Sequence, residues 1–283
     1  MKRKTQTLSA IALCFALCFS LSGCGSSDNP PQNGSDNVSE INQQDKAAAN
    51  EAYYEWKDNL ITELTSEGKE QTTLVIPARC EGFWGGLIGG KFEAVAFEDD
   101  DDVDLDTAFN GVDTLRSVDL PANLTVIPFR CFASCKSLEE INIPASVNEL
   151  EDDAFSSCDA LENIDLSKTG IKKLSAGTFQ YCGLLSEVKL PEGLETICSY
   201  AFTKCNALAS VSIPGSVKVI EGSAFLNSGI TDVYFDEGIT GIIIDKTAFG
   251  NDCLSITAHV KAGSWMDQNR EAWDIPFKEI VAE

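Results

Sequence analysis

The 283-residue sequence has a single histidine, His259, and only two methionines. A Ser–His–Asp or Cys–His catalytic arrangement would have to be built on this one histidine, and the chain contains no nucleophile-elbow motif. It has no Cys-x-x-Cys pair for zinc and no Gly-x-x-x-x-Gly-Lys-Ser/Thr loop for phosphate. We therefore expect no catalytic residue, metal or cofactor, and so no enzyme. His259 is predicted to lie at a surface turn just after the last strand.

Basic residues are scarce. The chain has 21 Lys and Arg against 44 Asp and Glu, which gives a net charge of −23. Removal of a signal peptide, argued below, takes away Lys2, Arg3 and Lys4 and lowers the charge to −26. A surface of this charge repels nucleic acid and anionic lipid surfaces. The composition therefore excludes nucleic acid as a partner.

The chain also contains a regular repeat, in which a small residue followed by Phe recurs every 23 or 24 residues. Such a constant period indicates a stack of equal turns, which is a solenoid. A unit this short cannot bury its own hydrophobic face, so neighbouring units must stack to make one continuous core. The repeated residues are Phe109, Phe132, Phe155, Phe179, Phe202, Phe225 and Phe249.

Each typical unit has a short alternation of apolar and polar residues nine positions after the Phe, as in Ile141-Asn142-Ile143. Alternation with β-branched residues predicts a short half-buried strand, and a proline such as Pro144 ends it. A second apolar pair, for example Val147 and Leu150, follows before the next Phe. The sequence therefore predicts a mainly β solenoid of short strands and turns.

The order Leu-x-x-Ile-x-Ile in Leu138–Ile143, followed by Pro and then by Ala-Phe-x-x-Cys, resembles a known repeat. It is similar to the BspA-like (Treponema-type) leucine-rich repeat of bacterial surface proteins. The resemblance extends over about residues 73–260 and implies a leucine-rich-repeat solenoid. It also implies a cell-surface protein that binds other proteins in adhesion to host, matrix or neighbouring cells. The unit ending at Phe249 has a longer link than the others.

The N-terminus indicates export, because a basic start precedes an apolar run from Leu8 to Leu21 that is too short to span a bilayer. We predict a signal peptide over residues 1–23. It ends in a Leu-Ser-Gly-Cys sequence that resembles the bacterial lipobox. The resemblance implies that Cys24 is acylated and anchors the protein to the cell membrane, facing outside the cytoplasm. An ordinary signal peptide cleaved nearby is the alternative.

The segments beside the repeats differ from them in composition. Residues 24–45 are polar and predict a flexible tether. Apolar residues at helical spacing from Tyr53 to Leu64 predict a helix from Asp45 to about Glu67. This helix would form an N-terminal cap over residues 46–72, and a partner-binding helix is the alternative. Aromatic residues within 261–283 predict a C-terminal cap.

Four of the 11 cysteines lie three residues after a repeated Phe, so the solenoid would stack them in a column. Parallel side chains on turns about 4.8 Å apart are too widely spaced at Cβ for a disulfide. We expect buried free thiols that act as small apolar groups, with disulfides as the alternative in an exported protein. Cys198 lies where other units have proline or polar residues and is predicted to be exposed and reactive. The column consists of Cys135, Cys158, Cys182 and Cys205.

The predicted strands would present their middle residues on one face of the solenoid. The N-terminal half of this face is acidic, and the C-terminal half is mixed and ends in an aromatic residue. A basic or neutral protein partner fits this pattern. The candidate binding residues are Asp119, Glu140, Asn142, Glu162, Asp165, Glu187, Lys189, Ser212 and Tyr234.

Two other functions remain open on the sequence. A carbohydrate-binding protein outside the cytoplasm would use exposed aromatic residues, and Tyr234, Phe83 and Trp84 are candidates. A structural envelope scaffold would need no diffusible ligand. The acidic run in residues 98–106 is predicted to be a solvated loop, because it lacks the glycine that an EF-hand loop requires. A calcium site is the alternative for that run.

Overall fold

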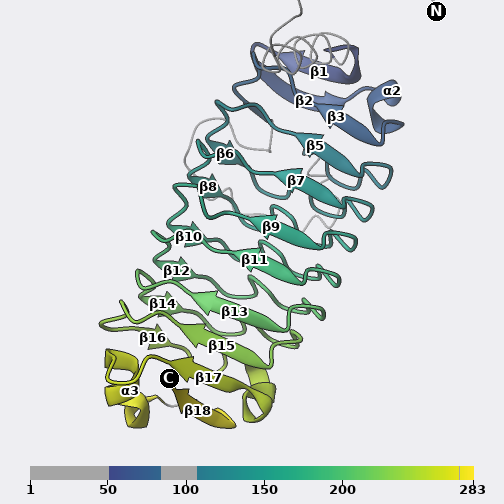
Figure 1. Ribbon diagram of the computed structural model, residues 1–283. Coiled ribbons are helices and arrows are strands. Elements are labelled where there is room, and N and C mark those ends of the chain that lie inside the picture. The colour runs from purple at the N-terminus through teal and green to yellow at the C-terminus, as the bar shows by residue number, and fades with distance from the viewer. Residues whose placement is uncertain (1–50, 84–106, 274) are drawn as a thin grey trace, which may run out of the picture. The chain divides into compact units, whose positions relative to one another are not determined.

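The computed structural model describes residues 51–83, 107–273 and 275–283. Within this part of the chain, the backbone turns repeatedly in one direction, and each turn from β5 to β16 contributes one strand to each of two rows (Figure 1). No helix in the described ranges is long and apolar enough to cross a membrane. The described residues thus have the mainly β solenoid architecture that the repeat predicts.

The first row contains the strands that the apolar alternation predicts. They form the parallel ladders β3-β5-β7, β9-β11 and β13-β15-β17-β18. In the three-residue strands β7 and β9, the middle residues Ile141 and Ile164 point into the core, and the residues on either side of them are exposed. The row consists of β3 (Thr73–Val75), β5 (Ser117–Asp119), β7 (Glu140–Asn142), β9 (Asn163–Asp165), β11 (Glu187–Lys189), β13 (Ser210–Ile213), β15 (Asp232–Phe235), β17 (Thr257–Val260) and β18 (Glu279–Ala282).

The second row is a six-stranded parallel sheet with the order β16-β14-β12-β10-β8-β6. Each strand ends at the second member of an apolar pair, for example Leu150, which pairs with Leu174 of the next turn. The proline at the end of the first-row strand precedes the turn that leads into this row. The row consists of β6 (Val126–Ile127), β8 (Glu149–Leu150), β10 (Lys173–Leu174), β12 (Thr196–Ile197), β14 (Val219–Ile220) and β16 (Ile243–Ile244).

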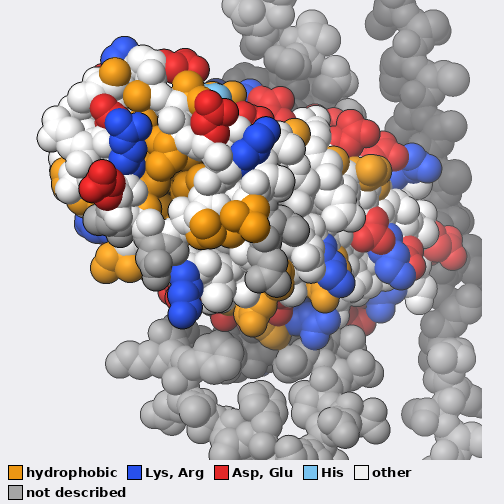
Figure 2. All heavy atoms as spheres, turned by 90° about the horizontal axis from the view of Figure 1, so that it is seen from below, with side chains coloured by type: hydrophobic (Ala, Val, Ile, Leu, Met, Phe, Trp, Pro, Cys, Tyr) orange, Lys and Arg blue, Asp and Glu red, His pale blue; other side chains and the backbone are white. Residues whose placement is uncertain are grey.

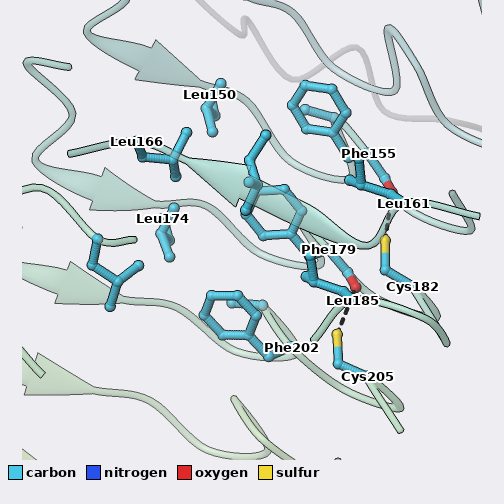
Figure 3. Close-up of a cluster of buried hydrophobic side chains, with 14 of the residues drawn as sticks. Leu150, Phe155, Leu161, Leu166, Leu174, Phe179, Cys182, Leu185, Phe202 and Cys205 are labelled. Atoms are coloured by element: carbon cyan, nitrogen blue, oxygen red, sulfur yellow. Dashed lines mark hydrogen bonds between the residues drawn. The ribbon is translucent and has the colours of Figure 1, made fainter. Parts of the chain in front are cut away.

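The repeated Phe rings form a continuous stack through the core, which Figure 3 shows for three of them. Successive ring centroids from Phe109 to Phe249 lie 5.0–5.6 Å apart, and the interplanar angles are 6–16°. An edge-on ring closes each end of the stack. Phe83 packs against Phe109 at 5.1 Å and 84°, and Phe277 packs against Phe249 at 5.5 Å and 63°. Aromatic pairs favour both geometries.

In five of the Phe turns, those of Phe132, Phe155, Phe179, Phe202 and Phe225, the residues two before and two after the Phe have a left-handed backbone conformation. This conformation directs alternate N–H groups toward the next turn. Arg130, Phe132 and Ser134 donate to the carbonyls of Asp152, Ala154 and Ser156 at 3.1, 2.9 and 2.7 Å. These bonds between turns offset the cost of the left-handed conformation in residues other than glycine.

The four column cysteines also bond to the adjacent turn. Each thiol donates to the carbonyl oxygen of the Phe one turn earlier, as Cys182 does to Phe155 and Cys205 does to Phe179, both at 3.1 Å (Figure 3). All eight cysteines in the described ranges are free and buried. The prediction of buried free thiols in the column is therefore confirmed.

The predicted N-terminal helix is wrong for residues 51–64. After η1 (Glu51–Tyr53), this segment is an antiparallel hairpin of β1 (Tyr54–Lys57) and β2 (Leu60–Leu64). Asp58 has φ 57° in the connecting turn. Strand β2 then pairs in parallel with β4 (Gly82–Phe83). Only a single helical turn, α2 (Ser66–Lys69), follows the hairpin, and Thr65 caps it.

The last part of the chain adds one more strand to the first row. β18 pairs with β17 in parallel. Ile275, four residues before β18 in the sequence, is buried. Three aromatic residues pack against the core: Trp265, Trp273 and Phe277. Figure 2, a view of this end, shows hydrophobic side chains lying between charged ones. The other elements here are η2 (Gly250–Ser255), α3 (Trp265–Asn269) and η3 (Arg270–Ala272).

Candidate binding surface

The outward side chains of the first-row strands form two parallel columns, because the ladders are in register. We call their solvent-exposed surface the strand face. Column one contains Ser117, Glu140, Asn163, Glu187, Ser210, Asp232, Thr257 and Glu279. Column two contains Asp119, Asn142, Asp165, Lys189, Ser212, Tyr234, His259 and Val281.

All nine predicted binding residues are exposed in the structure. Eight of them belong to the two columns, and Glu162 lies one residue before β9, at the position that Glu139 has before β7. The alternation therefore identified the strand face from the sequence alone. It missed uncharged residues of column one, such as Ser117, Asn163 and Ser210, because the prediction comprised only the middle residue of each alternation and charged flanking residues.

A hollow of ≈550 Å³ lies over strands β7, β9 and β11 on this face. Five carboxylates and two lysines contribute to its lining, so its net charge is negative. We call it the acidic hollow. Its charged residues are Glu139, Glu140, Glu162, Asp165, Glu187, Lys168 and Lys189.

Some of these carboxylates already have partners and others do not. Two hydrogen bonds from Ser167, through its hydroxyl and its backbone N–H, lower the pKa of Asp165. Glu187 forms an ion pair with Lys189 at 3.2 Å. Glu140 and Glu162 have no side-chain hydrogen bond or ion pair within the described ranges. These two carboxylates are therefore available to a partner.

The C-terminal part of the strand face has an aromatic pair. Tyr234 and His259 stack with ring centroids 4.3 Å apart and an interplanar angle of 15°. The Nε2 atom of His259 lies 2.7 Å from a carboxylate oxygen of Asp232, and this hydrogen bond lowers the pKa of Asp232. The prediction of a surface turn for His259 is wrong, because the residue lies within β17 and its side chain is only 17% exposed.

The repeats match a family model described as the BspA type leucine rich repeat region, with six copies over residues 105–231. These residues are a BspA-type leucine-rich repeat region. The comparison with curated proteins gave no match.

Solved structures of bacterial leucine-rich-repeat proteins are similar to this chain at low sequence identity. A leucine-rich repeat protein of Treponema pallidum is 20% identical, with 81% of this chain and 95% of that chain covered and a TM-score of 0.49. A leucine-rich repeat protein of Bacteroides ovatus is 19% identical, with 71% and 52% covered and a TM-score of 0.46. This chain thus spans about half the length of the Bacteroides protein. A leucine rich cell surface protein of Faecalibacterium prausnitzii is 15% identical, with 79% and 90% covered and a TM-score of 0.32.

Cys198, outside the strand face, was predicted from the sequence to be an exposed, reactive thiol. Cys198 is only 5% exposed, so the prediction that it is exposed is wrong. Burial raises the pKa of its thiol to about 11, with a further contribution from the Glu221 carboxylate. A thiol is nucleophilic only as the thiolate, so Cys198 is expected to react slowly at neutral pH.

We expect alkylation of the native protein with iodoacetamide at about pH 8 to leave Cys198 and the column cysteines unmodified, since their thiols are buried and out of reach of the reagent. Mass spectrometry of digested protein would measure the modification at each site. Ser212→Cys, on the exposed strand face, is the control and should react within minutes. Modification of Cys198 as fast as Cys at position 212 would contradict the burial.

The sequence analysis also named residues for a carbohydrate site, for lipid attachment and for a calcium site. Phe83 is 7% exposed and packs in the core, which removes it as an exposed sugar-binding aromatic. Trp84, Cys24 and the acidic run at 98–106 lie outside the described residues. Within the described ranges, no group of three or more His, Cys, Asp or Glu residues is arranged to hold a metal ion.

Proposed function

We propose that the protein is a membrane-anchored surface lipoprotein whose strand face binds a basic or neutral protein in adhesion. The acidic hollow is the observation that supports this function most directly. It places exposed carboxylates, including the unpaired Glu140 and Glu162, on one continuous surface of parallel strands. Extended solenoid surfaces of this kind are used for binding in other repeat proteins.

The arrangement of charge favours a protein of opposite sign. Like charges on adjacent strands repel one another, and a cationic partner would relieve this repulsion on binding. Complementary charge also accelerates encounter and selects among partners, and salt screens the effect. Binding through the acidic hollow should therefore weaken as ionic strength rises.

The sequence supports the proposed location and role. The lipobox-like sequence before Cys24 would provide lipid attachment, and residues 24–45 would act as a tether between membrane and solenoid. The resemblance to BspA-like repeats supports adhesion to host, matrix or neighbouring cells as the role of the binding face. Fold similarity does not identify the ligand, so the test must identify it by binding.

Charge reversal at three residues of the acidic hollow, Glu140→Lys, Glu162→Lys and Asp165→Lys, tests this function. We expect binding to an immobilised partner to fall at least about tenfold, because several carboxylates that face the partner become cationic. The measurement is surface plasmon resonance against purified extracellular matrix proteins at about 50 and 300 mM NaCl.

The matched control makes the same change in net charge away from the strand face, with Asp113→Lys, Glu149→Lys and Asp159→Lys, all at exposed positions. It should retain most of the affinity. Equal binding by the two triple variants would overturn the assignment of the face. If the unmodified protein binds none of the matrix proteins or intact cells, the adhesion function fails and the envelope scaffold is favoured.

A further inference from the structure

A second hollow, of ≈560 Å³, lies on the strand face beside the acidic hollow. Its floor is strand β13, where both outward columns have a serine, Ser210 and Ser212. Neighbouring strands have longer side chains at the same positions, with Glu187 and Lys189 on one side and Tyr234 on the other. We call this site the serine hollow. Two short side chains between longer ones leave a space that opens to solvent.

One wall of the serine hollow is an aromatic ring with a free face. Tyr234 pairs with Ser212 on one side and with His259 on the other. The imidazole covers one face of the phenol ring at 4.3 Å. Ser212 is too short to cover the opposite face, and Tyr234 remains 43% exposed. The open face is thus fixed in orientation by the stack on its other side.

The remaining lining is charged and mostly acidic. Glu187 and Lys189 form the opposite wall and are paired with each other at 3.2 Å. Glu192 and Asp236 lie where the strands end. Asp236 accepts a hydrogen bond from the N–H of Gly238, and Glu192 has no partner within the described ranges. Since the only cation is already paired with Glu187, the lining favours a ligand of positive charge.

We propose that the serine hollow takes an arginine side chain of a protein partner, with its guanidinium stacked on Tyr234. This inference rests on the proposed function, since it assigns the anchor that a basic protein would insert. A guanidinium is planar and cationic, so one face can lie on the phenol ring while its edge donates to carboxylates and serine hydroxyls. The open side of Tyr234, the serine floor and the unpaired Glu192 provide these three types of contact.

Other ligands match the lining less completely. A lysine ammonium has no flat face to stack and is more strongly hydrated than a guanidinium. A neutral sugar ring could lie on Tyr234 and bond to the serines, but it would gain nothing from the net negative charge of the lining. An anionic ligand would be repelled by Glu187, Glu192 and Asp236.

The test is an NMR titration of the mature chain, with Cys24→Ser to prevent acylation, using N-acetyl-arginine methylamide as the probe. We expect saturable shifts at Ser212 and Tyr234, with a dissociation constant on the order of millimolar for a single side chain. The lysine derivative should bind at least about threefold more weakly. Tyr234→Phe should retain binding, because the ring face is preserved.

Ser212→Tyr fills the hollow with a ring that extends the existing stack, and it should abolish the shifts. The matched control is Asn142→Tyr, in the same column on β7. Thermal unfolding would confirm that both variants fold. Equal shifts with arginine and lysine derivatives, or shifts that persist in Ser212→Tyr, would overturn the proposal. Shifts with methyl glucoside but not with arginine would favour a carbohydrate site.

The outcomes separate this inference from the proposed function. If charge reversal in the acidic hollow abolishes protein binding but the arginine probe does not shift Tyr234, the serine hollow is not the anchor and the function stands. If the probe binds but no matrix protein or cell does, the arginine site exists and the adhesion function fails.

Discussion

Replacement of Phe179 by alanine is expected to lower the free energy of unfolding by about 3–5 kcal/mol. Phe179 is fully buried, and rings lie on both of its faces, Phe155 and Phe202, each at 5.6 Å. The substitution leaves a cavity in the middle of the stack that these fixed neighbours cannot fill. Urea denaturation followed by circular dichroism would measure the change.

The control is Tyr181→Ala, two residues away in the same turn. Tyr181 is 43% exposed, and its main partner is the Lys204 ammonium above its ring, so the cost should be well under that of Phe179→Ala. Because each turn contacts only its neighbours, the Phe179 cavity should also separate unfolding of the two halves into distinct transitions. A cost below about 1 kcal/mol for Phe179→Ala would show that the stack does not hold the solenoid together.

Alkaline pH is expected to destabilise the protein steeply, because the fold buries protonated thiols. Burial raises the pKa of Cys135 to about 12, and it raises the pKa of Cys131, Cys158 and Cys205 as well. In the unfolded chain a thiol titrates near pH 8.5. Each raised pKa therefore contributes stability that is complete below that pH and is lost as pH rises toward the folded-state value.

Each such thiol should lower the free energy of unfolding by about 1.4 kcal/mol per pH unit between the two pKa values. Urea denaturation at pH values from about 8 to 11, with a reducing agent present, would measure the slope. Tyrosines also titrate there, so the diagnostic comparison is with Cys135→Ala/Cys158→Ala. That variant starts less stable but should lose stability more slowly with pH. Identical slopes would contradict a role for these thiols.

The parts of the fold that could be predicted are those in which the spacing of residues in the sequence matches the spacing of buried positions in the structure. The 23–24-residue spacing of Phe and the alternation of the first row correspond directly to the core and to the strand face. The second row was visible only as apolar pairs, because a two-residue strand is too short to show alternation. Its strands are defined by pairing with the adjacent turns, which no single unit reveals.

The N-terminal hairpin was missed because its apolar residues also fit a helical stripe. Tyr54, Ile61 and Leu64 are the residues that the hairpin buries. The signal for a turn was present at Asp58-Asn59, where an Asp in the left-handed conformation reverses the chain. β2 pairs with β4, which lies 18 or more residues further along the chain. This long-range pairing stabilises the strand conformation of β2 more than the local sequence favours a helix.

The site was predictable in composition but not in shape. Exposure of eight of the nine candidate residues follows from alternation, whereas the hollows depend on which side chains are adjacent across turns. The buried position of Cys198 and the contact of His259 with Asp232 depend on packing between turns, 23 to 27 residues apart. Sequence position within one unit does not contain that information.

The edge-on rings of Phe83 and Phe277 have a consequence for how such a protein can change in length. Both ends of the Phe stack are sealed, so a duplicated unit added at either end would leave an uncovered ring. A unit duplicated between Phe109 and Phe249 keeps both closures and repeats the same bonds between turns. Gene rearrangement within the array would thus lengthen the surface and shift the spacing between the two hollows, without a new core having to evolve.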